Sequence, residues 1–506
     1  MTAVGGERPT PGTPVAPIEL VAEGAVRSRI PARRVTVGDA TLGRLRDVCA
    51  SITVDEREVA EASRDWWPLA MQWALEGAVP GLASAVATPR SAEEVAAVLV
   101  VCNADLVPVT AAAGRSGVCG ASVPVHGGVV LDLCELSGIV DVDNESLVLD
   151  VRPGTFGEPL EAELRSSHGA TLGHWPQSVA ISTVGGWLAC RGAGQLSTRY
   201  GKIEDMVVGL DVALADGRRI TTGGAPRAAA GPDLTQLFVG SEGTLGVITG
   251  ARLRLHPEPA AERRDAWSFS SFVDGLDACR RILRRGATPA VLRLYDDVEA
   301  NRSYQTGDRH VLLAYDEGDP ALIDAVMRVV AEECDSVGGE RADVGLVDRW
   351  FDHRNEVSAL EALTRRGFVV DTMEIAARWR DLPKIYDATT AAIAAVPHAV
   401  NATAHQSHAY SDGACLYFTF AGRPPGEERE SFYVAAWDAG TRAVLENGGA
   451  LSHHHGVGLN RSRFMAEALG GALDVLRAAK QALDPNGILN PGKLGLDGPF
   501  GEVPWP

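Results

Sequence analysis

Residues 238–249 read Phe238-Val239-Gly240-Ser241-Glu242-Gly243-Thr244-Leu245-Gly246-Val247-Ile248-Thr249, where three glycines and two hydroxyl residues interrupt an apolar run. Glycine has no Cβ, so its backbone N–H can approach a ligand closely. We therefore expect the glycine amides to meet phosphate or ribose oxygens, with the hydroxyls of Ser241 and Thr244 as further donors. Taken alone, the same string also fits an ordinary loop between two strands.

Two further stretches of small residues precede this loop, and a short motif follows it. The first reads Ala111-Ala112-Ala113-Gly114-Arg115-Ser116-Gly117, between apolar strands expected near 107–110 and 128–133. The second, residues 173–187, continues into Arg191-Gly192-Ala193-Gly194. The motif near the C-terminus is Asn490-Pro491-Gly492-Lys493. The ordered combination is more specific than any one of these segments, and a pyrophosphate would fit across the first stretch.

This order of loops resembles the vanillyl-alcohol oxidase-like flavoproteins, over about residues 85–260 and the C-terminal region. The resemblance implies an α+β protein with a FAD-binding domain of the p-cresol methylhydroxylase (PCMH) type and an α/β substrate cap domain. FAD is the cofactor that it implies. By the same matching, the FAD contacts fall on Ala111, Ala112, Ala113, Gly114, Arg115, Ser116, Gly117, Gln177, Ser178, Ser182, Thr183, Ala189, Cys190, Arg191, Gly192, Ser241, Glu242, Gly243, Thr244, Leu245, Gly246, Val247 and Ile248.

Two positions depart from that family's usual pattern. The first loop has alanines where consecutive glycines are more common, and its Arg115 is unusual; either FAD binding is weaker or Arg115 itself reaches a phosphate. Gln177 stands where the family has an acidic residue, which removes a charge and keeps hydrogen-bonding capacity.

The second half of the chain resembles the alkyldihydroxyacetonephosphate synthases. The residues that carry this resemblance are Tyr410-Ser411-Asp412-Gly413-Ala414-Cys415-Leu416-Tyr417-Phe418 and the run Ser452-His453-His454-His455-Gly456. Tyr410 matches the family's catalytic tyrosine, and His453, His454 and His455 match its histidine loop. Arg354 lies roughly where the family has a substrate-binding arginine, whose guanidinium suits a phosphate or carboxylate.

The resemblance implies a reaction in which a fatty alcohol replaces the acyl group of acyl-dihydroxyacetone phosphate, a step of ether-lipid synthesis without net redox change. The alternative is an FAD-linked dehydrogenase or oxidase of a 2-hydroxy acid, in which the histidine loop would take the hydroxyl proton. Fold does not decide between them. A flavin-binding carrier would not need the tyrosine and the histidines together.

The seven histidines between residues 353 and 455, of twelve in the chain, indicate a site there. Consecutive side chains diverge, so His453, His454 and His455 cannot all face one ion, and we expect no metal. The histidine run is then either a loop that handles protons and binds anions, or a connector with satisfied histidines.

The composition changes at His256-Pro257-Glu258-Pro259, where we place a domain boundary. The expected organisation is a disordered segment 1–30, an FAD-binding domain 31–260, a cap 261–465 and a return to the FAD domain over 466–506. A capping box at Ser91 predicts a helix through Val101, Asp216-Gly217 predicts a hairpin, and a single helix is expected from Arg463 to Leu483.

The net charge and the spacing of the cysteines restrict which partners and which cellular compartment we expect. The net charge of −19 argues against nucleic acid and against electrostatic attachment to anionic lipid. We therefore expect a small or lipid-like anionic substrate, at most peripheral contact with a membrane, and possibly a homodimer. The scattered cysteines form no CxxC pair and suit the cytoplasm.

Overall fold

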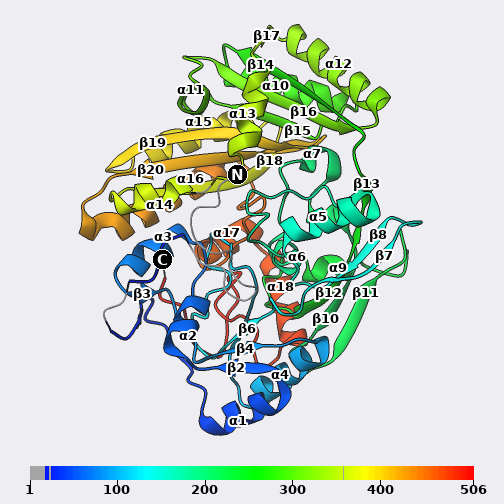
Figure 1. Ribbon diagram of the computed structural model, residues 1–506. Helices are drawn as coiled ribbons and strands as arrows, with labels where there is room; N and C mark the ends of the chain where they lie inside the picture. The colour runs from blue at the N-terminus through cyan, green and yellow to red at the C-terminus, as the bar shows by residue number, and fades with distance from the viewer. Residues whose placement is uncertain (1–16, 22–23, 357, 506) are drawn as a thin grey trace.

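The computed structural model describes residues 17–21, 24–356 and 358–505. Figure 1 shows two halves stacked on each other, with the N-terminal and C-terminal parts of the chain in the lower half and the middle of the chain above. The expected disorder of 1–30 falls largely outside the described residues. It does not hold for the described end of that segment, because Arg27–Ser28 (β1) pairs in parallel with Ala78–Val79 (β3) and Ile30 is buried.

The lower half contains two main sheets. One has four strands in the order β2-β4-β6-β5, and the other has five strands in the order β11-β10-β12-β8-β7. Their bounds are β2 Ser51–Thr53, β4 Ala85–Thr88, β5 Val109–Ala112, β6 Val129–Asp132, β7 Ile139–Asp143, β8 Val148–Val151, β10 Val207–Ala213, β11 Arg219–Gly223 and β12 Val247–Arg254. The helices of this half are α1 Asp39–Val48, α2 Glu56–Ala62, α3 Pro68–Leu75, α4 Ala92–Ala104, α5 Gly157–His168, α6 Val184–Cys190, α7 Ser197–Tyr200, α8 Ile203–Met206 and α9 Thr235–Phe238.

Local signals in the sequence are confirmed in this half. Ser91 caps α4 by accepting from the Glu94 N–H at 3.1 Å, although the Glu94 carboxylate bonds the backbone of Ala50 and Arg90 instead of completing the box. The predicted hairpin forms between β10 and β11. The first loop follows β5, and the loop of residues 239–246 leads into β12, so both come at the ends of buried strands.

The upper half is built on one seven-stranded sheet with the order β17-β14-β16-β15-β19-β20-β18. The strands are β14 Ala261–Phe269, β15 Val291–Tyr295, β16 His310–Gly318, β17 Glu340–Arg341, β18 Val369–Arg378, β19 Ala399–Ala409 and β20 Gly413–Gly422. The helices are α10 Phe272–Arg284, α11 Asp297–Tyr304, α12 Pro320–Ser336, α13 Gly345–His353, α14 Ser358–Arg365, α15 Leu382–Ala394 and α16 Arg429–Glu446.

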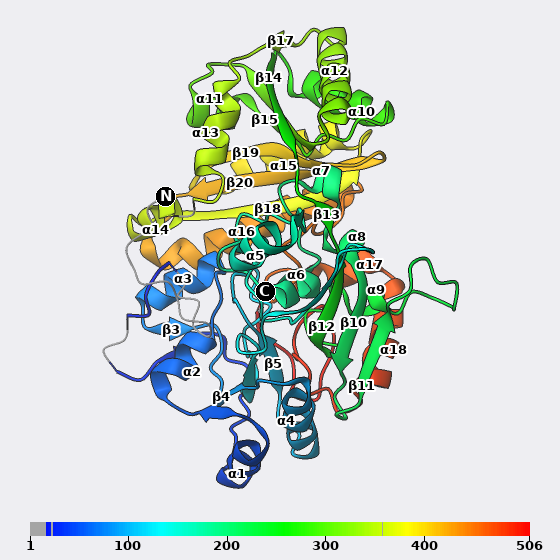
Figure 2. The same ribbon diagram turned by 45° about the vertical axis from the view of Figure 1, so that its right-hand side comes forward.

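The two faces of this sheet differ in chemistry because strand side chains alternate. Apolar residues such as Leu294, Phe418 and Ile375 point into a core shared with α10, α15 and α16. Their neighbours Arg293, Tyr417 and Glu374 point to the opposite face. In Figures 1 and 2 that opposite face looks toward the lower half, with α7 directly beneath it.

The short helix α7 joins the two halves. Its four residues all bond the upper sheet: Ser197 bonds His408, Thr198 accepts from Ala409, Arg199 pairs with Asp316, and Tyr200 donates to Glu317. One turn of the lower half is thereby fixed on the strands that carry the candidate site.

The C-terminal part returns to the lower half, but not as one helix. A 3₁₀ turn Ser462–Phe464 leads into α17 Met465–Leu469, and α18 Ala472–Leu483 follows after a break. The prediction of a single helix was wrong because Gly470 takes φ 51° and ψ −131°, a conformation that glycine tolerates and a helix does not. Beyond α18, Leu489 pairs with Val109 at the edge of the four-stranded sheet.

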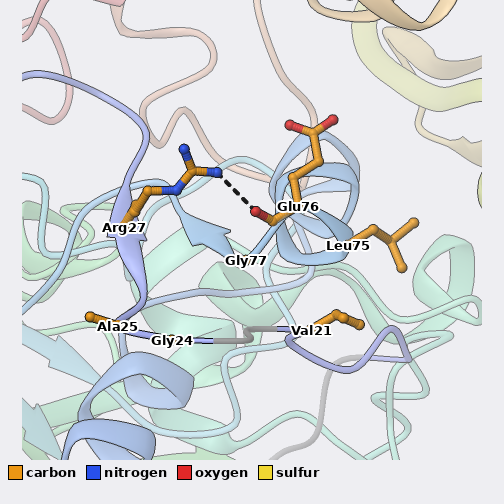
Figure 3. A pocket seen from close by; sticks show the side chains of 7 residues that line it. All are labelled: Val21, Gly24, Ala25, Arg27, Leu75, Glu76 and Gly77. Atoms are coloured by element: carbon orange, nitrogen blue, oxygen red, sulfur yellow. Dashed lines mark hydrogen bonds between the residues drawn. The ribbon is translucent and has the colours of Figure 1, made fainter.

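A cavity of about 370 Å³ lies beside β1, between Arg27 and the end of α3 (Figure 3). Arg27 donates to the carbonyl of Glu76 across it at 3.0 Å. It is lined by Val21, Gly24, Ala25, Arg27, Leu75, Glu76 and Gly77. It contains no predicted site residue, so we do not assign it to the chemistry. Among the described residues, no helix is both long and apolar enough to cross a membrane.

The link through α7 leads to a first prediction. The Asp316 side chain is fully buried, and Arg199 is its ion-pair partner, so Arg199→Leu leaves a buried carboxylate without a counter-charge. We expect the free energy of unfolding in urea to fall by about 3 kcal/mol. Arg218→Leu, which removes a partner from an exposed pair with Asp216, should change it by less than about 1 kcal/mol. Equal effects of the two substitutions would contradict this role of α7.

Candidate functional site

The four predicted cofactor segments lie against one another. A Cβ at Gly114 would lie 3.2 Å from Ser182 Cα, and one at Gly243 would lie 3.6 Å from the Ala111 Cβ. The Glu242 N–H donates to the carbonyl of Ala189 at 2.9 Å, which joins the last two segments. Residues far apart in the sequence therefore form one continuous surface of small residues.

This surface offers backbone amides to a ligand more than hydroxyl groups. Ser241 donates its hydroxyl to the Phe238 carbonyl at 2.8 Å, and Thr244 donates to the Ser241 carbonyl at 2.7 Å. Ser182 accepts from Trp187 Nε1, and Thr183 caps α6. The expected hydroxyl donors of residues 241 and 244 thus stabilise the loop itself.

Arg115 and Gln177, which depart from the usual pattern of the family, make different contacts. Arg115, at φ 48°, pairs with the buried Asp132 at 2.5 Å, so its charge is neutralised within the protein. Gln177 is exposed, and its amide donates to the carbonyl of Glu356 in the upper half at 3.4 Å.

Buried polar atoms without partners around this surface fit a polar cofactor. Among the described residues, Asp65 Oδ2, Arg115 Nε and Asn490 Oδ1 are buried and make no hydrogen bond. Gly117 has an exposed backbone, and a Cβ there would meet only Asp65 Oδ2, at 3.8 Å. Burial raises the pKa of Asp65 to about 7 and lowers the pKa of the fully buried Lys493 to about 7. These groups and the space at Gly117 fit a polar cofactor such as FAD. The amides of Gly240 and Gly192 do not serve it, because they donate to the carbonyls of Leu188 and Trp187, both at 2.8 Å.

Tyr410 lies at the turn between β19 and β20, and its hydroxyl lies 2.8 Å from His453 Nε2. Burial raises the pKa of this phenol far above its usual value. At neutral pH the phenol is therefore protonated and hydrogen-bonded to His453, and the tautomer of His453 decides which of the two donates. The sequence placed these two residues in one site, and the structure brings them into direct contact.

A chain of imidazoles continues from Tyr410. His453 Nδ1 and His454 Nδ1 are 2.8 Å apart, and His408 stacks on His453 with ring centroids 4.9 Å apart. Burial lowers the pKa of His408, His453 and His454 well below the usual value, so these rings are neutral at pH 7. His455 is different, because its Nδ1 turns toward the Glu374 carboxylate at 3.2 Å.

A row of polar residues crosses four strands beneath the histidines. The register places Tyr295 opposite His405, His405 opposite Tyr417, and Tyr417 opposite Glu374. His405 and Tyr417 stack at 4.9 Å, and His405 Nδ1 bonds the buried Glu299 at 3.0 Å. Sequence reasoning did not select these residues. Polar residues that alternate with apolar ones along buried strands were the available signal.

Two arginines lie beside this row. Arg354 donates to Gln195 Oε1 at 3.2 Å and lies over Phe351, Trp350 and Trp175 at 4.8, 5.5 and 5.8 Å. Arg293, which the sequence analysis missed, donates to His405 Nε2 at 2.6 Å and lies 6.0 Å from the centre of the same Trp350 ring. In the part of the chain that the structure describes, no carboxylate lies within 4.0 Å of either guanidinium, whereas other arginines such as Arg199 and Arg461 are paired.

Three imidazoles also have a spacing at which a metal ion can be held. Nitrogens of His408, His453 and His454 lie within 4.8 Å of one another. The third ring comes from β19 rather than from the consecutive run. Both ring nitrogens of His453 already have hydrogen-bond partners. His408 Nδ1 is hydrogen-bonded to Ser197 Oγ at 2.6 Å. The arrangement suits a hydrogen-bonded chain, and the absence of a metal stays a prediction.

Comparison with known proteins agrees with this geometry. The FAD binding domain family matches residues 83–223, and the C-terminal domain family of FAD linked oxidases matches residues 258–494. The uncharacterized FAD-linked oxidoreductase YgcU of Escherichia coli O157:H7 is 32% identical over 436 residues, 81% of this chain and 88% of that protein. The chain belongs to the FAD-linked oxidoreductases. It binds FAD, and its α+β fold has two domains.

Other similar proteins have different names. The alkyldihydroxyacetonephosphate synthase of Dictyostelium discoideum is 28% identical over 83% of this chain and 74% of its own length. Glycolate oxidase subunit GlcD of Bacillus subtilis is 29% identical over 81% of this chain and 88% of its own length. A solved alkyldihydroxyacetonephosphate synthase superposes with a TM-score of 0.75 over 94% of this chain and 90% of that one, at 23% identity. That likeness concerns the fold.

Gly117 allows a direct test of the cofactor surface. Gly117→Val adds a side chain where the protein itself leaves space, so we expect a folded protein that has lost most of its FAD. The FAD-to-protein absorbance ratio after gel filtration measures this. Gly43→Val, on the exposed side of α1 with no atom within 4 Å of an added Cβ, is the control. Full FAD content in Gly117→Val would remove this loop from the cofactor site.

Proposed function

We propose that this FAD-dependent enzyme catalyses an alkyldihydroxyacetonephosphate synthase reaction, in which a fatty alcohol replaces the acyl group of acyl-dihydroxyacetone phosphate and the acyl chain leaves as a carboxylate. The proposal draws on the synthase relatives and on the contents of the site. It assigns substrate binding to Arg354 and Arg293, and proton handling to Tyr410 with His453 and His454. The three latter residues match the motifs that first indicated this family.

The observation that carries the proposal is the pair of arginines on Trp350. Among the described residues neither guanidinium has a carboxylate within 4.0 Å, although the more distant Glu299 acts electrostatically on Arg293 and Glu317 acts on Arg354, so part of their positive charge remains available beside the imidazoles. A phosphate monoester carries nearly two negative charges at neutral pH and accepts the paired N–H groups of arginine. A single carboxylate would neutralise only one of the two guanidinium groups. The charge balance therefore supports a phosphorylated substrate.

The proposal takes Tyr410 as the donor to His453 Nε2, which gives proton movement a direction. A neutral His453 then carries its proton on Nδ1 and donates it to His454 Nδ1. A proton taken from substrate at one end of this chain can be returned through the other members. Bound FAD supplies an electrophilic ring that accepts electrons from a substrate carbon. The protein's residues orient the substrate next to it and manage the protons.

The second candidate is oxidation of a 2-hydroxy acid. It is favoured by the neutral state of His408 and His454, since a neutral imidazole can take the proton from a hydroxyl group. One arginine would then bind the carboxylate. The likeness to a glycolate oxidase subunit supports this alternative.

The wider setting of the enzyme is proposed on the same basis. We propose a cytoplasmic protein that acts on a small or lipid-like anion, contacts membranes at most peripherally, and forms a homodimer without a nucleic-acid partner. The net charge of −19 supports the exclusion of nucleic acid.

Anaerobic mixing with candidate substrates separates the two reactions. Exchange of alcohol for acyl on acyl-dihydroxyacetone phosphate, with FAD oxidised at the end, is the expected result. Lasting two-electron bleaching of FAD by a 2-hydroxy acid, without exchange activity, would instead establish the dehydrogenase. Product analysis by mass spectrometry accompanies the flavin spectrum.

Substitution of Tyr410 tests the proton chain. Tyr410→Phe keeps the ring and removes the hydroxyl, so the rate should fall by about 10²- to 10⁴-fold while FAD content persists. His454→Ala should cause a similar loss. The double variant should lose much less than the product of the two, because the residues act as one unit. Near-full turnover by Tyr410→Phe on a verified substrate would make the tyrosine a packing residue and favour the dehydrogenase.

A further inference from the structure

The loop that carries the three histidines, residues 452–458, has no helix or strand of its own. Its backbone is wrapped around one carboxylate oxygen instead. Glu374 Oε1 accepts from the N–H groups of His453, His454 and His455 at 3.1, 3.0 and 2.8 Å, and from the Ser452 hydroxyl at 2.6 Å. Successive backbone N–H groups around one anion form a nest. Here a side chain of the protein itself occupies the nest.

The other oxygen of Glu374 sets the charge of this arrangement. Glu374 Oε2 pairs with Arg461, and both side chains are fully buried. The Arg461 guanidinium lies 4.9 Å from the Trp437 ring centre, which holds it from the other side. His455 Nδ1 approaches the same oxygen at 3.2 Å. Arg461 thus neutralises the carboxylate, and His455 Nδ1 lies beside it without a hydrogen bond.

Two residues of the FAD domain hold the same loop. Glu242, from the glycine-rich loop, accepts from the N–H of Val457 at 2.6 Å and of Gly458 at 2.9 Å. Lys202 donates to the carbonyl of His453 at 2.6 Å. Both ends of the loop are therefore fixed, and Glu374 determines how the residues between them are turned.

The consequence lies in the direction of the rings. A nest turns successive side chains to different sides, so His453 meets Tyr410, His454 meets His453, and His455 points back to Glu374. We propose that Glu374 is the positioning residue of the site: it holds His453 and His454 in line with Tyr410 and keeps His455 as its own partner, outside the proton chain. This inference rests on the proposed function of Tyr410 and the histidine loop.

The first test reads the rings themselves and needs no substrate. FAD-loaded protein labelled with ¹⁵N in its histidine side chains gives two-bond proton–nitrogen NMR spectra that report each ring's tautomer, with single His→Gln variants for assignment. Glu374→Asp keeps a negative charge for Arg461 but shortens the side chain by one methylene, which moves the carboxylate away from the loop. The signals of all three loop histidines should therefore shift. Glu333→Asp is the matched control. Glu333 is also a buried carboxylate of the cap domain, and it pairs with Arg281 and Arg285. The control substitution should leave these signals unchanged.

The second test asks whether His455 belongs to the proton chain of Tyr410, His453 and His454. It does not require Glu374→Asp to fold. Tyr410→Phe should shift the signals of His453 and His454 and leave His455 in place. On a verified substrate, His454→Gln should lose about 10²- to 10⁴-fold in rate and His455→Gln less than about tenfold.

Several results would overturn the inference. Unmoved His453 and His454 signals in folded, FAD-loaded Glu374→Asp would show that Glu374 does not position them. A His455 signal that follows Tyr410→Phe, or a His455→Gln loss equal to that of His454→Gln, would place His455 in the chain. Lack of turnover on every candidate substrate would count against the proposed function, and the NMR results would still decide the role of Glu374.

Discussion

In the functional loops of this protein, buried carboxylates accept the backbone hydrogen bonds that helices and sheets accept elsewhere. Loops that approach a ligand have backbone N–H groups without helix or sheet partners, and leaving such groups buried and unpaired is costly. Glu374 satisfies residues 453–455, and Glu242 satisfies Val457 and Gly458. Glu161 does the same for Leu172 and Gly173, and Asp484 for Ile488 and Leu489. The shape of the site depends on these anions.

Placing these anions inside requires compensation. A buried charge is tolerated when it is paired and hydrogen-bonded, and removing one partner costs more than the pair contributes. Glu374 has Arg461, and Asp484 has Lys480. Among the described residues, Arg293 and Arg354 have no carboxylate within 4.0 Å, and aromatic rings lie beside both guanidinium groups. This contrast within one protein is why we assign their charge to a substrate rather than to the fold.

The sequence predicted the local features well and the long-range ones poorly. Glycine spacing predicted the cofactor loops, and their contacts with FAD stay a prediction. Tyr410 and the histidine run were predicted together through resemblance, and the structure brings Tyr410 into contact with His453. The row from Tyr295 to Glu374 was not found, because it depends on how four strands are paired and a register is not visible in any one of them. Arg293 was missed for the same reason. Ser241 and Thr244 were read as ligand donors, and the structure shows that their hydroxyls close the loop on itself. Gly470 was included in the single predicted helix, although its backbone conformation ends α17.

The division of labour between the halves explains how one fold serves several reactions. The cofactor surface consists mainly of backbone and small residues, and its side chains are engaged within the protein, so it responds little to the nature of the substrate. The groups to which we propose to assign substrate recognition lie on one face of the cap sheet, at alternate positions of β15, β18, β19 and β20. A substitution there changes charge or proton affinity without moving a strand, since the opposite face keeps its apolar core. The histidine loop joins the cofactor surface to the cap face, held by Glu374 from the cap and by Glu242 from the cofactor loop, in addition to the contacts of α7. Substitutions on the cap face can therefore change its chemistry while these two carboxylates keep the histidine loop in place.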